Sequence, residues 1–166
     1  SQRLTTDLSK QKEHAESVLG SIEEKKATFF NATESMRDSA KAFLIYCIYP
    51  RSIQSTDDAI YCARFAFGLH RRETPGFSTL HYIDELISIV AGSLFGVTEG
   101  EAAHLAILLW ETWKVVNKWR YEESLYDKEV AGTPGSYMVA SDPSPDAGVE
   151  SEPQATSHKD FAVLYN

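Results

Sequence analysis

The sequence of 166 residues is 43% hydrophobic and 24% charged, a composition that allows one domain with a real core and excludes wholesale disorder. Its net charge of −8 disfavours nucleic-acid binding, which relies on Lys and Arg to neutralise phosphates. The longest uncharged stretch, Leu86 to Thr98, is shorter than the roughly 20 residues of a membrane-spanning helix, so no segment is predicted to cross a membrane. Because the sequence starts without Met and stops in an apolar run, we expect it to be part of a longer protein.

Residues 1–32 are predicted to form one long helix. An apolar position recurs every seven residues, at Leu8, Ala15, Ile22 and Phe29. This spacing keeps a narrow stripe on one side of a helix, although polar residues interrupt the stripe here. Two interpretations stay open: the helix packs on its own domain, or Leu8, Ile22 and Phe29 contact another chain.

Residues 33–131 are predicted to form a helical core domain of four helices separated by short breakers. The first helix spans about residues 33–49 and is expected to end at Pro50, which cannot continue the hydrogen-bonding pattern. The second begins after Ser55, whose hydroxyl can cap the first backbone amides, and ends near Arg72.

The third helix is predicted to start at Ser78 and the fourth at Thr98, which has the spacing of a capping box with Glu101. The fourth is expected to run past Tyr121 towards Ala131. No alternating strand pattern is visible. The predicted fold class is therefore all-α, with stacked antiparallel helices that form a bundle or a solenoid-like segment.

Residues 132–157 change in composition to Pro, Ser, Gly and acidic residues. Such a segment cannot bury enough apolar surface to offset its ordering entropy, so we expect a flexible acidic linker. Residues 158–166 become apolar again and are predicted to start a further helix that docks on the core.

The sequence offers little for catalysis or metal binding. Cys47 and Cys62 do not belong to a Cys-x-x-Cys pair and lie among apolar neighbours, so both are expected to be buried free thiols. Glu101 and His104 have the spacing of half a di-iron site, but the second half is missing and Glu101 is better explained as the capping acid. We therefore predict no catalytic residue, no metal site and no cofactor, and a protein that is not an enzyme.

Two further groups of side chains are candidates for contacts with a partner. Arginines gather where the second core helix ends, at Arg64, Arg71 and Arg72. Cations there complement the helix dipole, which explains them without a ligand, and a phosphate or partner contact is the alternative. Tryptophans of the fourth helix span more than one face: Trp110 is expected in the core, and Trp113 and Trp119 are candidates for an interface.

Several motifs follow one another in the middle of the chain. They are Pro50-Arg51, Ser55-x-x-Asp58-Ala59, Tyr61-Cys62-Ala63-Arg64-Phe65, Thr74-Pro75-x-Phe77-x-Thr79-Leu80 and Asp84. Their combination resembles the C-terminal part of the THO complex subunit 2 family. The resemblance covers about residues 11–135 and does not extend into the acidic segment.

The resemblance implies a nuclear, non-enzymatic scaffold in the transcription–export assembly, which couples transcription to mRNA packaging and export. It implies other THO complex subunits and a DEAD-box RNA helicase as partners, with RNA bound indirectly through the complex and no membrane. It brings no catalytic residues. The alternative that the residues leave open is a direct RNA-binding helical module, which would need a basic face.

Overall fold

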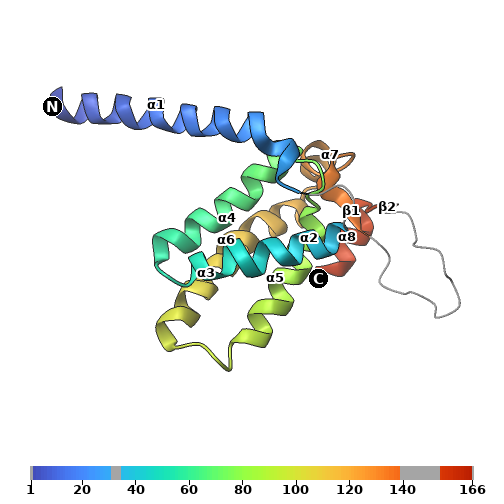
Figure 1. The fold of residues 1–166 in the computed structure, drawn as a ribbon. Coiled ribbons are helices and arrows are strands. Elements are labelled where there is room, and N and C mark those ends of the chain that lie inside the picture. Colours follow the sequence, from blue (N-terminus) through green and yellow to red (C-terminus); the bar gives the residue numbers. More distant parts are fainter. Residues whose placement is uncertain (1, 31–34, 139–153, 166) are drawn as a thin grey trace, which may run out of the picture.

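The computed structural model describes residues 2–30, 35–138 and 154–165 (Figure 1). The all-α prediction is confirmed, because the described chain consists almost entirely of helices. These are α1 (Gln2–Lys25), η1 (Lys26–Thr28), α2 (Met36–Phe43), η2 (Leu44–Ile48), α3 (Tyr49–Ser52), α4 (Thr56–Arg71), α5 (Thr79–Ser93), α6 (Glu99–Tyr121), α7 (Glu123–Glu129), η3 (Pro134–Ser136) and α8 (His158–Leu164). Among these described residues, no helix is both long and apolar enough to span a membrane.

The first core helix does not end at Pro50 as predicted. α2, the π-helical turn η2 and α3 follow one another without a break, and the helical path ends only at Ser52. Proline lacks an N–H and its ring crowds the carbonyl one turn earlier. The wider π turn directly before it, closed by a hydrogen bond from the Tyr49 N–H to the Leu44 carbonyl, makes room for the ring.

The helix starts agree with the capping pattern of the sequence. The Ser55 hydroxyl accepts a hydrogen bond from the Asp58 N–H, and Ser78 does the same for α5. Thr98 and Glu101 form a complete capping box at the start of α6. These side chains satisfy backbone donors that a helix start leaves free, so each boundary is set by local chemistry.

The fourth core helix is shorter than predicted, because α6 stops at Tyr121 and does not continue towards Ala131. Glu122 has an extended backbone (φ −118°, ψ 90°), and α7 starts directly after it. The Trp119 indole donates to the Glu129 carboxylate at 2.8 Å, which ties α7 back against α6.

The core lies where α4 packs along α6 and α2 packs along α5. It is made of apolar side chains from each of these helices and from η2, among them Ala40, Leu44, Phe67, Leu80, Leu86, Leu105, Leu108 and Val116. α1 stands apart: it leaves the stack as a straight arm (Figure 1).

The segment predicted as a linker is structured at both ends. Residues 139–153 lie outside the described residues. Before them, η3 leads into β1 (Tyr137–Met138), and after them β2 (Gln154–Ala155) pairs with β1 in an antiparallel ladder. No pattern in the sequence predicts this short pair of strands.

Helix α8 then packs on the core. Phe161 is fully buried, with its ring centroid 5.0 Å from that of Tyr126 and 6.3 Å from that of Trp119. The Tyr126 hydroxyl donates to the Thr156 carbonyl at 2.8 Å. We call residues 123–138 and 154–165 the C-terminal segment.

A candidate docking groove between α1 and α4

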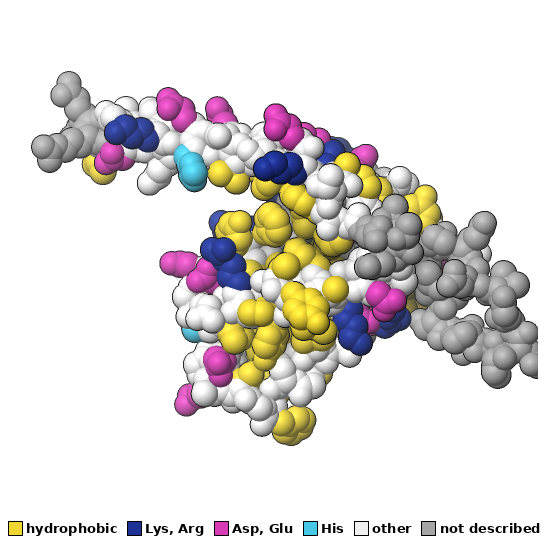
Figure 2. Space-filling view, viewed as in Figure 1, with side chains coloured by type: hydrophobic (Ala, Val, Ile, Leu, Met, Phe, Trp, Pro, Cys, Tyr) yellow, Lys and Arg dark blue, Asp and Glu magenta, His cyan; other side chains and the backbone are white. Residues whose placement is uncertain are grey.

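The arm α1 is exposed along nearly its whole length. Its apolar side chains face solvent, with 76% of Leu4 and 53% of Leu8 exposed and Val18 and Leu19 also open. Figure 2 shows hydrophobic side chains along the side of the arm that faces the body of the molecule. An apolar stripe that the described part of the chain leaves uncovered is typical of an interaction surface.

The helix that carries the stripe is shorter than predicted, and it ends before Phe29. α1 ends at Lys25 and a 3-10 turn follows, so Phe29 lies beyond the helix that carries Leu8 and Ile22, and it is exposed. The next residue, Phe30, is the anchor instead: its ring centroid lies 5.4 Å from that of Phe77 and 5.6 Å from that of Phe43. The sequence shows two adjacent phenylalanines but does not indicate which one packs inward.

The end of α1 and the turn η1 contact the C-terminal end of α4 through polar groups. Lys26 Nζ donates to the Arg72 carbonyl at 2.8 Å, and Arg72 Nε lies 3.8 Å from a Glu23 carboxylate oxygen. These contacts fix where the arm leaves the body. Farther towards its N-terminus, the arm diverges from α4 (Figure 1).

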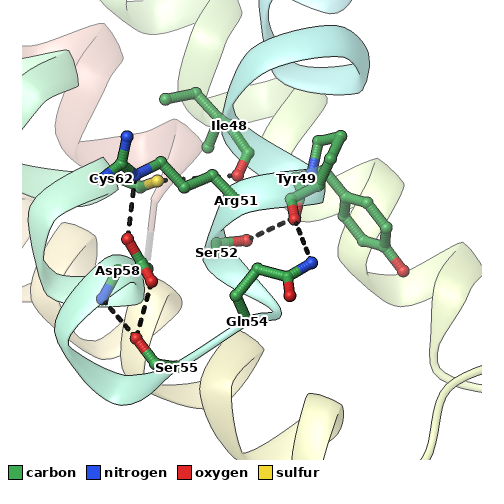
Figure 3. A network of polar contacts seen from close by, with 9 residues as sticks. Ile48, Tyr49, Arg51, Ser52, Gln54, Ser55, Asp58 and Cys62 are labelled. Atoms are coloured by element: carbon green, nitrogen blue, oxygen red, sulfur yellow. Dashed lines mark hydrogen bonds and ion pairs between the residues drawn. The ribbon is translucent and has the colours of Figure 1, made fainter.

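The start of α4 is built by a polar network at the corner with α3 (Figure 3). Arg51 Nε donates to Asp58 at 2.9 Å, and Asp58 also accepts from the Ser55 hydroxyl at 2.7 Å. These bonds lower the pKa of Asp58, with the Ser55 hydrogen bond as the main cause. The Arg51 guanidinium lies over the Tyr61 ring, 4.5 Å from its centroid. Tyr61 in turn stacks on Phe65 at 5.9 Å, so the corner orients two aromatic rings on the outer face of α4.

A groove of about 360 Å³ lies between the arm and this face of α4. One wall comes from α1 and the other from α4, and the lining residues are Val18, Leu19, Ile22, Tyr61, Arg64, Phe65, Gly68, Leu69, Arg71 and Arg72. Two of the three predicted surfaces therefore meet: Ile22 of the stripe and the three arginines. Leu8 and Phe29 do not line the groove.

The three arginines of the groove differ in what they bind. Arg72 is half-buried and donates to the Gly68 carbonyl at 3.0 Å in addition to its contact with Glu23. Arg64 and Arg71 are exposed and form no ion pair with any of the described residues. The helix dipole accounts for Arg71 at the end of α4, but Arg64 lies two turns earlier, where the dipole has little effect. The groove thus combines apolar walls with positive charge that the described part of the chain leaves unpaired.

Comparison with known proteins gives the chain a family. The model of the family described as "Transcription factor/nuclear export subunit protein 2" matches residues 1–166. The chain belongs to this family. It is 33% identical to the THO complex subunit 2 of Homo sapiens over 137 residues, which cover 82% of the chain and 9% of the human protein. It is 36% identical to the THO complex subunit 2 of Arabidopsis thaliana over 134 residues, 80% of the chain and 7% of that protein. No solved structure matches the chain.

The motifs that resemble this family mostly hold the fold together. Thr74 donates from its hydroxyl to the Leu69 carbonyl at 2.9 Å, and Phe77 and Leu80 are fully buried. Cys62 is also buried, and burial raises the pKa of its thiol to about 11. Three motif residues also line the groove: Tyr61 and Arg64, which are exposed, and Phe65, which is half-buried and packs against the core as well.

The tryptophan surface differs from the prediction. Trp119 is only 1% exposed, since its ring packs against Phe67 and His70, so it offers no contact to a partner. Trp113 is half-buried against Tyr165. Trp110, which was expected in the core, is 63% exposed. Periodicity places these residues on several faces of α6, and the packing of α4 and of the C-terminal segment decides which of those faces are covered.

The cysteines and the candidate metal-ligating pair, Glu101 and His104, have structural roles or lie at the surface. The prediction that both cysteines are buried holds for Cys62 and is wrong for Cys47, which is exposed on η2. Glu101 serves the capping box, and His104 Nδ1 lies 2.8 Å from the Ile53 carbonyl. Within the described ranges, no group of three or more His, Cys, Asp or Glu side chains is placed to hold a metal ion.

A buried polar cluster joins the C-terminal segment to the core. His70 Nε2–H donates to the Glu129 carbonyl at 3.0 Å, so Nδ1 accepts from the Thr79 hydroxyl at 2.8 Å. Burial lowers the pKa of His70, and burial likewise lowers the pKa of His81. Gly135 of η3 lies directly against His70 and Thr79, where a Cβ would overlap both. The cluster is structural, because hydrogen bonds within the chain use both nitrogens of the His70 ring.

Proposed function

We propose that this chain is a non-enzymatic scaffold segment of the THO complex. In this role it positions other THO subunits, and through them a DEAD-box RNA helicase, in the nuclear assembly that couples transcription to mRNA packaging and export. RNA is then bound indirectly, and no membrane is involved. Membership of the THO complex subunit 2 family supports the role.

The observation that carries the proposal is the exposed arm α1 above the groove on α4. Exposing the apolar stripe of a 24-residue helix to water costs free energy, and this cost is removed if another chain covers the stripe. The body beneath it has a closed core and a capped helix framework. A rigid body with an open arm suits a segment that holds neighbouring subunits in one relative geometry.

A direct RNA-binding helical module is the second candidate. Arg64, Arg71 and Arg72 lie together on the groove and could meet phosphates. Against this, the chain carries a net charge of −8, and the groove walls are largely apolar. If this segment binds RNA, its affinity for RNA should depend strongly on salt concentration, and its contacts in the complex should be lost on nuclease treatment. Direct contacts with other subunits should survive nuclease treatment.

Deletion of residues 1–166 from the full-length subunit tests the scaffold role. The complex is purified from nuclei through a different subunit, with nuclease, and its composition is compared with the undeleted complex. We expect the deletion to lose at least one subunit and to reduce stimulation of the helicase. A deleted complex that assembles completely and stimulates the helicase normally would refute the proposal. Subunits that are lost in both complexes on nuclease treatment would favour the RNA module.

A further inference from the structure

We propose that the groove between α1 and α4 receives an acidic amphipathic helix from a partner protein. The apolar ridge of that helix inserts between Ile22 on the arm and Phe65 on α4. Its carboxylates pair with Arg64 and Arg71. This inference rests on the proposed scaffold function and specifies the chemistry of one partner.

The shape of the groove favours a helix as the occupant. The α1 wall presents Val18, Leu19 and Ile22, spaced three and four residues apart, which is the spacing of a helix seam. Leu4 and Leu8 continue the open stripe beyond the groove. A partner helix that lies along the arm would therefore bury the groove and the stripe together, as in helix-in-groove recognition.

The opposite wall adds a charge requirement. Arg64 and Arg71 are seven residues apart on α4, which places them on one face about 10.5 Å apart along the helix axis. Neither has an ion-pair partner among the described residues. Two carboxylates seven residues apart on a partner helix would match this spacing. Tyr61 and Phe65 lie on the same wall, so the ion pairs would form at the edge of an apolar contact, where they are less screened.

Other occupants fit less well. The arm of a second copy is amphipathic but carries similar numbers of acidic and basic residues, so it lacks the net negative charge that the two arginines require. Single-stranded RNA could pair with the arginines but would leave the aliphatic wall of α1 uncovered, because nucleobases stack on aromatic side chains. An acidic helix satisfies both walls.

Site-specific photocrosslinking in the full-length subunit, within its native complex, tests the inference. Benzoylphenylalanine replaces Phe65 in the groove and, as a control, Trp110, an exposed aromatic residue of α6 that does not line it. Mass spectrometry then identifies the peptide joined to each position. We expect the Phe65 position alone to capture a partner segment with an apolar helical stripe and acidic residues seven apart.

Charge reversal sharpens the test. Arg64→Glu with Arg71→Glu should lower the crosslink yield about tenfold, since reversing two partly shielded pairs costs more than a single exposed pair. The matched control is Lys118→Glu with Lys128→Glu, two exposed lysines outside the groove, which should leave the yield unchanged. Reversing the two carboxylates of the captured segment to Lys should restore the crosslink to the Glu variant. A variant that had simply misfolded could not be rescued in this way.

The outcomes separate the inference from the proposed function. The inference would be overturned if Phe65 captured a second copy of the subunit, another part of the same chain, or RNA. It would also be overturned if Phe65 captured nothing, or if the crosslink yield did not change on reversal of the arginines. If the complex still requires residues 1–166 for assembly in that case, the scaffold role stands and the contact lies elsewhere. If the deletion has no effect either, both proposals fail.

Discussion

The arm α1 and the C-terminal segment are both peripheral helical regions, but they are held in opposite ways. α1 has 24 residues and leaves its apolar stripe open, whereas α7 and α8 have seven residues each and bury Tyr126 and Phe161. Helices of seven residues do not persist alone in water, so tertiary packing must form them. The arm is long enough for local propensity to matter. The contrast indicates that the C-terminal segment belongs to the cooperative core, whereas α1 is a surface element with an uncovered apolar stripe.

Removing the central ring of the C-terminal segment should have the largest effect. Phe161→Ala deletes a fully buried side chain that contacts Trp119, Tyr126 and Tyr165, and we expect the free energy of unfolding to fall by about 3–5 kcal/mol. Urea unfolding followed by tryptophan fluorescence measures it. Val163→Ala in the same helix is the control, because Val163 is exposed and should change stability by less than about 0.5 kcal/mol. Equal effects of the two variants would mean that α8 does not belong to the core.

The close approach of Gly135 to the polar cluster gives the next largest effect. In Gly135→Ala the new Cβ would lie 2.8 Å from the Thr79 hydroxyl and overlap the His70 ring, so η3 must move. We expect a loss of about 1–3 kcal/mol in the free energy of unfolding. Gly92→Ala serves as the comparison, since nothing lies within 4 Å of the Cβ it would add. A neutral Gly135→Ala would show that η3 is not packed against His70 in solution.

The buried histidines make the stability depend on pH. The pKa values of His70 and His81 are lowered in the folded chain, mainly by burial, so the unfolded chain binds protons more readily. The contribution of these two histidines to the free energy of unfolding is therefore fully present above about pH 6.5 and decreases as the pH falls below it, with a slope of at most about 1.4 kcal/mol per pH unit for each histidine.

Unfolding at pH 7.5 and 5.5 measures this dependence. His70→Gln should make the dependence on pH weaker, because it removes one of the two groups. His14→Gln, on the exposed arm, should leave it unchanged. A wild-type chain that is more stable at pH 5.5 than at pH 7.5 would contradict the sign.

The parts of the fold that could be predicted from the sequence are those with a local cause. Ser55, Ser78 and Thr98 cap their helices because a side-chain oxygen two or three residues from a free N–H is enough to satisfy it. The prediction that the helix ends at Pro50 is wrong. Proline usually ends a helix, but here a π turn makes room for its ring, and no pattern in the sequence indicates that turn.

The parts that could not be predicted depend on long-range packing. Ile22 and the arginines are far apart in the sequence, and the half-buried Phe30, which packs against Phe77, holds the end of the arm against the core so that they meet. Trp119 is predicted as an interface residue because nothing near it in the sequence shows that α4 and α8 cover it. The sequence therefore indicates individual residues of the groove, such as Ile22 and Arg64, but not that they lie in one site.

The smallest predicted effect separates the two regions most directly. Gly20→Ala and Gly92→Ala make the same change at exposed helical positions, and in each the added methyl group meets no atom within 4 Å. In α5, the gain in helix propensity should raise the free energy of unfolding by about 0.5 kcal/mol, because α5 unfolds with the core. In α1, the same gain should increase the helical signal in far-UV circular dichroism but leave the unfolding midpoint seen by tryptophan fluorescence unchanged. A midpoint that rises with Gly20→Ala would mean that the arm unfolds with the core, and the open stripe would then need an explanation other than a missing partner.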